Sequence, residues 1–231
     1  YTIGLYDDIY QVDFKLKFIF QIIVAKILVD QGLLIDNLNG FFGYLEIPYM
    51  LAQFFTIFII VLIVNAVNFS DGIDGLAITE SIKGLLLIIF LSQSTLDFGL
   101  NYMFFIVIVA ILPLYIYNFR KNNKVFLGDS GSLFLGGIIS IGVINLCNNL
   151  NYDYVSISSP LLIFIIALYP IIDLINVVSR RIIKRKSPFK ADKNHIHHFL
   201  IDKGYSHFQA LTIITTCMGL LQLLFIYLST N

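Results

Sequence analysis

The sequence predicts an all-α fold, a polytopic transmembrane helix bundle with about seven spans. Hydrophobic residues make up 58% of the 231 residues and charged residues only 13%, whereas a soluble domain carries about 25% charged residues. The mean hydropathy is +0.83. Since no polar or Pro/Gly-rich linker interrupts the apolar pattern, we expect residues 1–231 to form a single integral membrane domain.

The predicted spans are apolar segments that approach the length of about 20 residues needed to cross a bilayer. The last three are near-continuous runs of Ile, Leu, Val, Phe and small residues. The first carries Lys26 and Asp30, and because charged groups are costly in lipid, we expect it to pack inside the bundle. The segments cover roughly residues 16–35, 51–69, 76–92, 101–118, 132–147, 160–178 and 208–228.

Positive charges are distributed unevenly along the chain, which predicts an orientation for these spans. Thirteen of the fifteen Lys and Arg residues lie in segments that also hold the Asp and His clusters. Positive residues resist translocation, so these segments are expected on the cytoplasmic face of the inner (plasma) membrane. The loops on the opposite side, near 36–50, 93–100 and 148–159, hold only acidic charges, Asp36, Glu46, Asp97 and Asp153.

The first polar motif, Asn68 to Leu76, connects two predicted spans and interleaves Asp71 and Asp74 with glycines. Glycine allows backbone to approach a ligand closely. Two carboxylates three residues apart suit a hard divalent cation or the polar part of a substrate, and Mg²⁺ prefers oxygen ligands of this kind. The alternative is a solvated turn in which one of the acids caps a helix.

The second motif, Val125 to Phe134, places Asp129 between glycines at the start of a span. The start of a helix presents free backbone N–H groups and a positive dipole end, both of which favour a phosphate. A metal bridging Asp129 and that phosphate is one hypothesis, and a structural Ser/Asp helix cap is the other. Asn118, just upstream, is either a substrate contact or a polar helix end.

Two further clusters complete the polar set. Asp7 and Asp8 precede the first span, and Lys15 and Lys17 follow them; the acids are either functional groups near a metal or a pair that favours a helix dipole. The last cluster contains the cations Arg180 and Arg181, the acid Asp192 and the histidines His195, His197 and His198. We expect its imidazoles to bond a diphosphate or sugar, with zinc binding and an exposed interfacial cluster as alternatives.

Asp173 and Asn176 lie about two turns before the predicted cytoplasmic end of their span. An acid within a span is costly unless it is paired or lines a polar cavity. We expect Asp173 either to pair within the bundle or to line the same cavity as the motifs.

Together the motifs resemble those of the polyprenyl-phosphate N-acetylhexosamine-1-phosphate transferases, glycosyltransferase family 4. The resemblance covers residues 1 to about 210 with the order and spacing intact. The His-Ile-His-His form, with Ser-Pro-Phe ahead of it, is more similar to the UDP-N-acetylglucosamine branch than to the peptidoglycan pentapeptide translocase. The residues that carry it are Asp7-Asp8 with Lys15, Lys17 and Gln21; Asn68-Phe-Ser-Asp-Gly-Ile-Asp-Gly-Leu; Val125-Phe-Leu-Gly-Asp-Ser-Gly-Ser; and Ser187-Pro-Phe with Asp192-Lys-Asn-His-Ile-His-His.

The resemblance implies transfer of an N-acetylhexosamine 1-phosphate, here GlcNAc 1-phosphate, from a UDP-sugar to undecaprenyl phosphate with release of UMP, which starts a cell-envelope glycan. It implies Mg²⁺ or Mn²⁺ as cofactor, with Asp129 as leading ligand and Asp71 and Asp74 at the metal or the nucleotide. Asp7 and Asp8 are expected to act at the lipid phosphate or the metal. The other substrate-binding candidates are Lys15, Lys17, Asn68, Asn118, Arg180, Arg181, His195, His197 and His198.

The resemblance also implies partners and limits. The expected partners are the UDP-sugar, undecaprenyl phosphate and membrane lipid, with no nucleic acid, and a homodimer is left open. Family members usually carry further membrane helices ahead of the Asp-Asp pair, so we expect an N-terminally truncated chain whose isolated residues 1–231 have weak activity or none.

Rival interpretations predict different chemistry. The nearest keeps the reaction but uses the muramoyl-pentapeptide nucleotide as donor. Alcohol phosphotransfer from a CDP-linked donor is disfavoured because that class places Ala-Arg after Asp-Gly, whereas Ile73-Asp74 follows here. An ion-coupled transporter using Asp30, Glu80 and Asp173 is disfavoured because such a protein centres its acids at mid-membrane.

Overall fold

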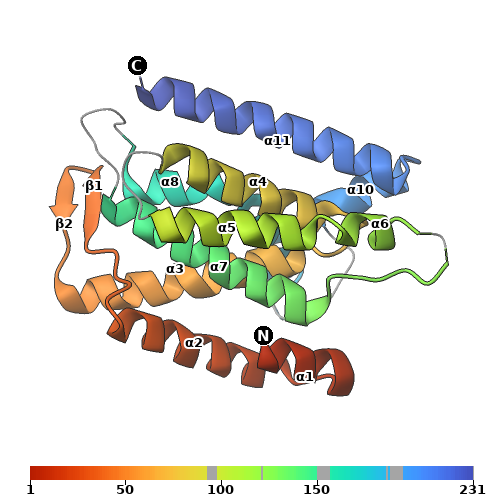
Figure 1. The fold of residues 1–231 in the computed structure, drawn as a ribbon, viewed down its shortest axis with the longest axis horizontal. Coiled ribbons are helices and arrows are strands. Elements are labelled where there is room, and N and C mark those ends of the chain that lie inside the picture. The colour runs from red at the N-terminus through yellow and green to blue at the C-terminus, as the bar shows by residue number, and fades with distance from the viewer. Residues whose placement is uncertain (93–97, 121, 150–156, 186, 188–194, 231) are drawn as a thin grey trace.

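The computed structural model describes residues 1–92, 98–120, 122–149, 157–185, 187 and 195–230, and it is a bundle of helices (Figure 1). The all-α prediction holds except for one small two-stranded sheet. The elements are α1 (Thr2–Tyr10), α2 (Phe14–Asp30), β1 (Asn37–Phe41), β2 (Tyr44–Glu46), α3 (Tyr49–Phe69), α4 (Leu76–Leu91), α5 (Phe98–Ile111), α6 (Leu114–Asn118), α7 (Gly128–Asn149), α8 (Ser159–Ile166), α9 (Leu168–Ile183), α10 (Ile196–Asp202) and α11 (His207–Thr230).

Helices α3 and α7 form the centre of the bundle. Both carry long series of buried residues, and their buried faces belong to the same hydrophobic core. A β-carbon added at Gly136 of α7 would lie 2.7 Å from the Cα of Val64 in α3. The two backbones therefore approach closely at this point, which is the way small residues let membrane helices pack.

Helix α2 lies along one side of the bundle and α11 along the other, with α3, α4, α5, α7 and α8 between them (Figure 1). Only Ala25 and Val29 of α2 are buried. The expectation that the first span packs inside the bundle is wrong. Lys26 and Asp30 instead pair with each other one turn apart on a face that is about half exposed, so the ion pair lowers the cost of each charge without burial.

The connection between α2 and α3 contains a hairpin that the sequence did not predict. Strands β1 and β2 are antiparallel, with Asn37 opposite Glu46 and Phe41 opposite Tyr44. Asn39 in β1 donates a side-chain hydrogen bond to the Ser159 hydroxyl, 2.6 Å away, at the start of α8. The hairpin is therefore attached to the bundle at the end remote from α1 and α10 (Figure 1).

Four helices in the described part of the chain are long and apolar enough to cross a membrane, or five if the pair α8 and α9, bent by 89°, counts as one span. These helices and the apolar composition mark a multi-pass membrane protein. The prediction of about seven spans is not confirmed. Helix α4, with 16 residues, matches the predicted span 76–92 within one residue, whereas α2 has 17 residues and ends at Asp30, before the predicted end near residue 35.

The close approach of the α3 and α7 backbones at Gly136 predicts that a side chain at this position lowers the stability of the fold. Gly136→Ala forces a methyl group against the backbone of Val64 and is expected to cost about 1–3 kcal/mol, the usual cost of overpacking. Gly137→Ala is the matched control, because no atom lies within 4 Å of an added β-carbon there. Thermal unfolding in detergent measures both variants, and equal melting temperatures would contradict the packing described for α3 and α7.

Candidate active site

A pocket of about 710 Å³ opens among α2, α3, α7, α9 and α10, and it has two chemically different parts. One wall is apolar and is formed by Phe14, Phe18, Phe58, Val61, Leu62, Leu133, Leu174, Val178 and Ile182. The other part is polar and gathers residues from all four sequence motifs, Lys17, Gln21, Asn65, Asn68, Asp71, Asp129, Arg181, His195, His197 and His198. The motifs are thus brought to one site, as the sequence predicted.

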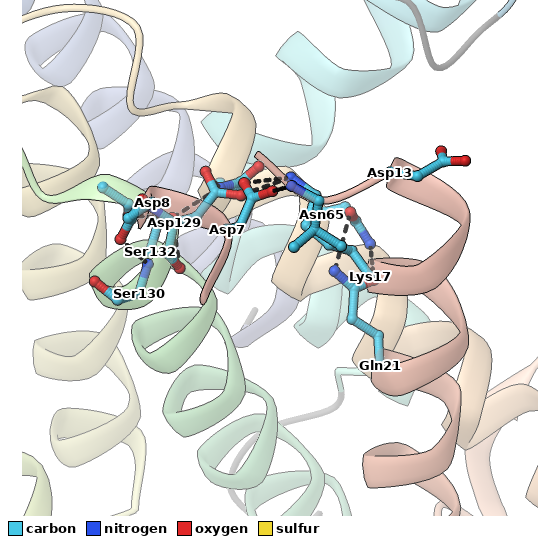
Figure 2. Close-up of polar contacts among 12 residues, drawn as sticks. Asp7, Asp8, Asp13, Lys17, Gln21, Asn65, Asp129, Ser130 and Ser132 are labelled. Carbon is cyan, nitrogen blue, oxygen red and sulfur yellow. Dashed lines mark hydrogen bonds and ion pairs between the residues drawn. The ribbon is translucent and has the colours of Figure 1, made fainter. Parts of the chain in front are cut away.

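The N-terminus of α7 is the point where three of the predicted acids meet. Asp8 of α1 accepts hydrogen bonds from the backbone N–H groups of Asp129 (2.8 Å) and Ser130 (3.0 Å), and Asp71 accepts one from Gly128 (3.1 Å). These donors are otherwise unsatisfied at a helix start, and Figure 2 shows Asp8 beside them. Phosphate binding at this helix start stays a prediction, and the acceptors that the structure shows for these N–H groups are carboxylates of the protein.

Asp7, next in sequence to Asp8, takes part in a separate ion-pair network. Lys17 Nζ lies 2.9 Å from Asp7 Oδ2 and 2.7 Å from Asp129 Oδ2, so one ammonium bridges two carboxylates (Figure 2). Burial raises the pKa of Asp7, but the hydrogen bonds from Lys17 and from the Val12 N–H outweigh that effect, and the pKa lies below its ordinary value. Asp7 therefore stays ionised, and the two adjacent acids have different roles.

The Asp129 carboxylate is held by side chains of two helices, α2 and α3. Lys17 of α2 contacts one carboxylate oxygen, and the Asn68 side chain of α3 donates to the other at 3.0 Å. Asn68 also donates to the Ser132 hydroxyl at 2.8 Å. One turn earlier on α3, Asn65 donates to Gln21 Oε1 at 2.6 Å. Gln21 and Asn65 both line the pocket, and Figure 2 shows them near Lys17.

The ionised form of the Asp71 carboxyl is disfavoured by its surroundings. Burial, and then the negative charges of Asp129 and Asp8, raise its pKa to about 7, although the Gly128 N–H donates to it. Asp71 and Asp129 both line the pocket, so two carboxylates share one partly desolvated region. Oxygen ligands with surplus negative charge are what a divalent cation requires, and this pair fits the predicted metal.

Asp74 and Asn118 point to other partners. The Asp74 carboxylate pairs with Lys124 and with His207 Nδ1, 3.1 Å away, and it is not among the pocket residues. Asn118 accepts from the Gly75 N–H at 2.6 Å and donates to the Val125 carbonyl at 3.0 Å. Both therefore fix the loops around the site, which favours the structural alternative for Asn118 and separates Asp74 from the other two predicted metal ligands.

The three histidines of the last cluster occupy different environments. His195 Nδ1 lies 2.7 Å from Asp173 Oδ2. His197 packs on Gly72, where an added β-carbon would lie 2.3 Å from Nε2. Burial lowers the pKa of His197 to about 3, and the neighbouring histidines lower it further against the charge of Asp173. His197 is therefore a neutral buried ring, whereas His195 and His198 line the pocket with more exposure.

A zinc site is disfavoured by the arrangement of these rings. Ligand atoms of Asp173, His195 and His197 lie within 4.8 Å of one another, but the rings of His195 and His197 are stacked at 15° with centroids 5.1 Å apart. Stacked imidazoles do not direct their nitrogen lone pairs at one tetrahedral centre. Asp192, the acid considered with these histidines, lies outside the described residues.

The remaining predicted cations differ in position. Arg181 is 2% exposed and lies in the pocket, with its guanidinium 5.5 Å from the centre of the Phe69 ring. Arg180 is exposed and donates to the side chain of Asn176, 2.8 Å away. Lys15 is also exposed and outside the pocket lining. Of the four predicted cations Lys15, Lys17, Arg180 and Arg181, the pocket lining contains Lys17 and Arg181.

Sequence reasoning missed Asn65 and left Asp173 undecided. Asn65 precedes Asn68 by three residues, so on one helix the two share a face, and that spacing was the available signal. Asp173 had the signal of an acid within a span, but its partner His195 lies 22 positions later. Pairing over that distance depends on how α9 and α10 pack.

Removing the Asp8 carboxylate is expected to loosen the start of α7. Asp8→Ala leaves the N–H groups of Asp129 and Ser130 without their acceptor and should cost about 1 kcal/mol, the typical cost of losing a helix cap. Asp202→Ala, at an exposed acid of α10, is the control. A melting temperature of Asp8→Ala equal to that of the control would contradict the capping role.

Asp71 makes the stability of the metal-free protein depend on pH. Because its folded pKa of about 7 exceeds the ordinary 3.8, the folded state binds more protons than the unfolded state between these values. The free energy of unfolding therefore falls as pH rises from 4 toward 7 and then levels off.

Asp71→Asn abolishes this effect, so its melting temperature relative to wild type should rise between pH 5 and pH 8 in the presence of a chelator. Asp202→Asn, at an exposed carboxyl, should show no such rise. If the melting temperatures of Asp71→Asn and wild type differ by the same amount at pH 5 and pH 8, the pKa of Asp71 is not raised.

The sequence matches the family model described as Glycosyl transferase family 4 over residues 1–147. A Bacillus subtilis protein named "Probable undecaprenyl-phosphate N-acetylglucosaminyl 1-phosphate transferase" is 34% identical over 221 residues, covering 92% of this chain and 58% of that protein. The Escherichia coli K12 "Undecaprenyl-phosphate alpha-N-acetylglucosaminyl 1-phosphate transferase" is 31% identical over 229 residues, covering 95% and 60%.

A third relative, the Mycolicibacterium smegmatis "Decaprenyl-phosphate N-acetylglucosaminephosphotransferase", is 31% identical over 237 residues, covering 95% of this chain and 58% of that protein. The chain thus spans about three fifths of the length of these relatives. Their names confirm the predicted N-acetylglucosamine branch. With its four polar motifs gathered at one pocket and its match over residues 1–147, the chain belongs to glycosyl transferase family 4.

Proposed function

We propose that the protein transfers N-acetylglucosamine 1-phosphate from UDP-N-acetylglucosamine to undecaprenyl phosphate, releasing UMP and forming a lipid-linked diphosphate sugar that starts a cell-envelope glycan. The observation that carries this proposal is the two-part pocket, in which an apolar wall adjoins a cluster of cations, acids, amides and imidazoles. The names of the relatives, which specify a polyprenyl-phosphate acceptor and an N-acetylglucosamine phosphate group, support the same reaction.

The apolar wall suits the prenyl chain of the acceptor. It combines aromatic residues of α2 and α3, Phe14, Phe18 and Phe58, with aliphatic residues of α9 such as Leu174 and Val178. A long isoprenoid gains binding free energy with each apolar group that it buries.

The polar part suits two phosphate groups that must approach each other. In the reaction, an oxygen of the lipid phosphate attacks the sugar-bearing phosphorus of the donor, a new P–O–P linkage forms, and the bond between the two donor phosphates breaks so that UMP leaves. The reacting groups are all anionic, so positive charge must offset their repulsion. Lys17 and Arg181 line the cavity and supply that charge.

Mg²⁺ or Mn²⁺ would be held by Asp129 and Asp71, the two carboxylates that line the pocket. Bound there, a divalent ion would neutralise charge on the donor diphosphate. The residues of the chain prepare this position: Lys17 and Asn68 fix the Asp129 carboxylate, and Gly128 orients Asp71. Lys17 also lies between Asp7 and Asp129, so its ammonium holds the two acids together.

The motif-bearing end of the bundle faces the cytoplasm of the inner membrane in this proposal. The support is the distribution of positive residues, which favours the non-translocated side. UDP-sugars would then reach the pocket from solution, and undecaprenyl phosphate from the bilayer.

A transfer assay tests the proposal. Full-length native protein is incubated with labelled UDP-N-acetylglucosamine, undecaprenyl phosphate and Mg²⁺, and label extracted into organic solvent is counted. We expect transfer by wild type, its loss with a chelator, and a decrease on the order of a hundredfold or more in Asp129→Asn.

The control variant is Asp202→Asn, an exposed acid outside the pocket, which should keep the wild-type rate. A parallel reaction with the muramoyl-pentapeptide nucleotide tests the donor. Transfer from that nucleotide alone would overturn the donor sugar, and wild-type turnover by Asp129→Asn would overturn the assignment of the site.

A further inference from the structure

Asp173 is a fully buried acid that the reaction described above does not use. It lies on α9 with no exposed surface, and both of its carboxylate oxygens have partners in the last motif. Oδ2 contacts His195 Nδ1 at 2.7 Å, and Oδ1 accepts the backbone N–H of Ile196 at 2.7 Å. The carboxylate is therefore hydrogen-bonded to two consecutive residues at the start of α10.

We propose that Asp173 is a positioning residue that fixes the orientation and tautomer of His195, so that His195 Nε2 is the ring atom presented to the substrate. This inference deepens the proposed function and rests on it. It distinguishes His195 from the other two histidines of the motif, because His195 is the one that Asp173 positions.

The direction of the hydrogen bond follows from the chemistry of the pair. An ionised carboxylate only accepts hydrogen bonds, so the proton in the contact with Asp173 resides on His195 Nδ1. Nε2 is then the nitrogen left for another partner, and His195 lines the pocket beside Arg181.

The packing around His195 restricts the ring further. Its side chain is 12% exposed. Its ring lies at 84° to the Phe69 ring with centroids 5.9 Å apart, and it stacks on His197. His197 is itself pressed on Gly72. Since the ring is enclosed on these sides, the hydrogen bond to Asp173 decides which nitrogen faces the cavity.

The two bonds of Asp173 allow the positioning role to be separated from folding. Asp173→Asn retains an oxygen that can accept the Ile196 N–H, but its amide group donates toward His195 Nδ1 and reverses the tautomer. The matched control is Glu80→Gln, which makes the same change at a carboxyl that is 4% exposed, pairs with Lys83 and lies outside the pocket lining.

A double-mutant cycle with full-length protein tests the inference. Wild type, Asp173→Asn, His195→Ala and the double variant are compared in the transfer assay with labelled UDP-N-acetylglucosamine. We expect Asp173→Asn to lower turnover on the order of tenfold to a hundredfold, the effect typical of the carboxylate partner of a functional histidine. The double variant should be no slower than His195→Ala, because Asp173 acts through His195. Glu80→Gln should keep wild-type turnover.

Histidine-selective ¹⁵N NMR supplies a readout that needs no turnover. We expect Nδ1 of His195 to be protonated in wild type and Nε2 to carry the proton in Asp173→Asn. Unchanged turnover, or losses that add in the double variant, would overturn the inference, as would a wild-type His195 with unprotonated Nδ1. If wild type transfers no sugar phosphate while the NMR result is as expected, the proposed function fails and the positioning of His195 stands.

Discussion

The structure of the site depends on how the N-terminus of α7 is satisfied. The backbone N–H groups of Gly128, Asp129 and Ser130 have no partners within their own helix, and carboxylates from α1 and from the loop after α3 accept them. A helix end buried without hydrogen-bond partners is costly. By supplying the partners, α1 and the loop after α3 stabilise the start of α7, and the bonds join three segments that are remote in sequence. Asp129 is the residue that this junction presents to the pocket.

The same junction sets the electrostatics of the cavity. Three acids, Asp8, Asp71 and Asp129, are brought close enough that the charges of two of them raise the pKa of the third. Asp8 and Asp71 are engaged by backbone donors, while Lys17 and Asn68 hold Asp129. Two of these acids, Asp71 and Asp129, line the pocket together with the cations Lys17 and Arg181. The cavity therefore contains both negative and positive side chains.

The histidine motif shows how burial divides residues that look equivalent in sequence. His197 is enclosed against Gly72 and has a pKa of about 3, so it stays neutral and acts as a packing element. His195, two positions earlier, reaches a buried acid and still borders the cavity. Since neighbouring positions at a helix start point in different directions, one short motif supplies both a support for the Asp71 loop and a group that lines the cavity.

The sequence by itself determined the fold class, the family and the gathering of the motifs at one end of the bundle, because apolar length, cation placement and motif order are local properties of the chain. It placed the end of the first span too late and missed the hairpin, since helix ends depend on packing and capping. Only the tertiary structure decided that Asp8 caps α7, that Asp74 pairs with Lys124 and His207, and that Asp173 holds His195. Each of these depends on a contact between segments remote in sequence, and residue type alone cannot specify which carboxylate reaches which donor.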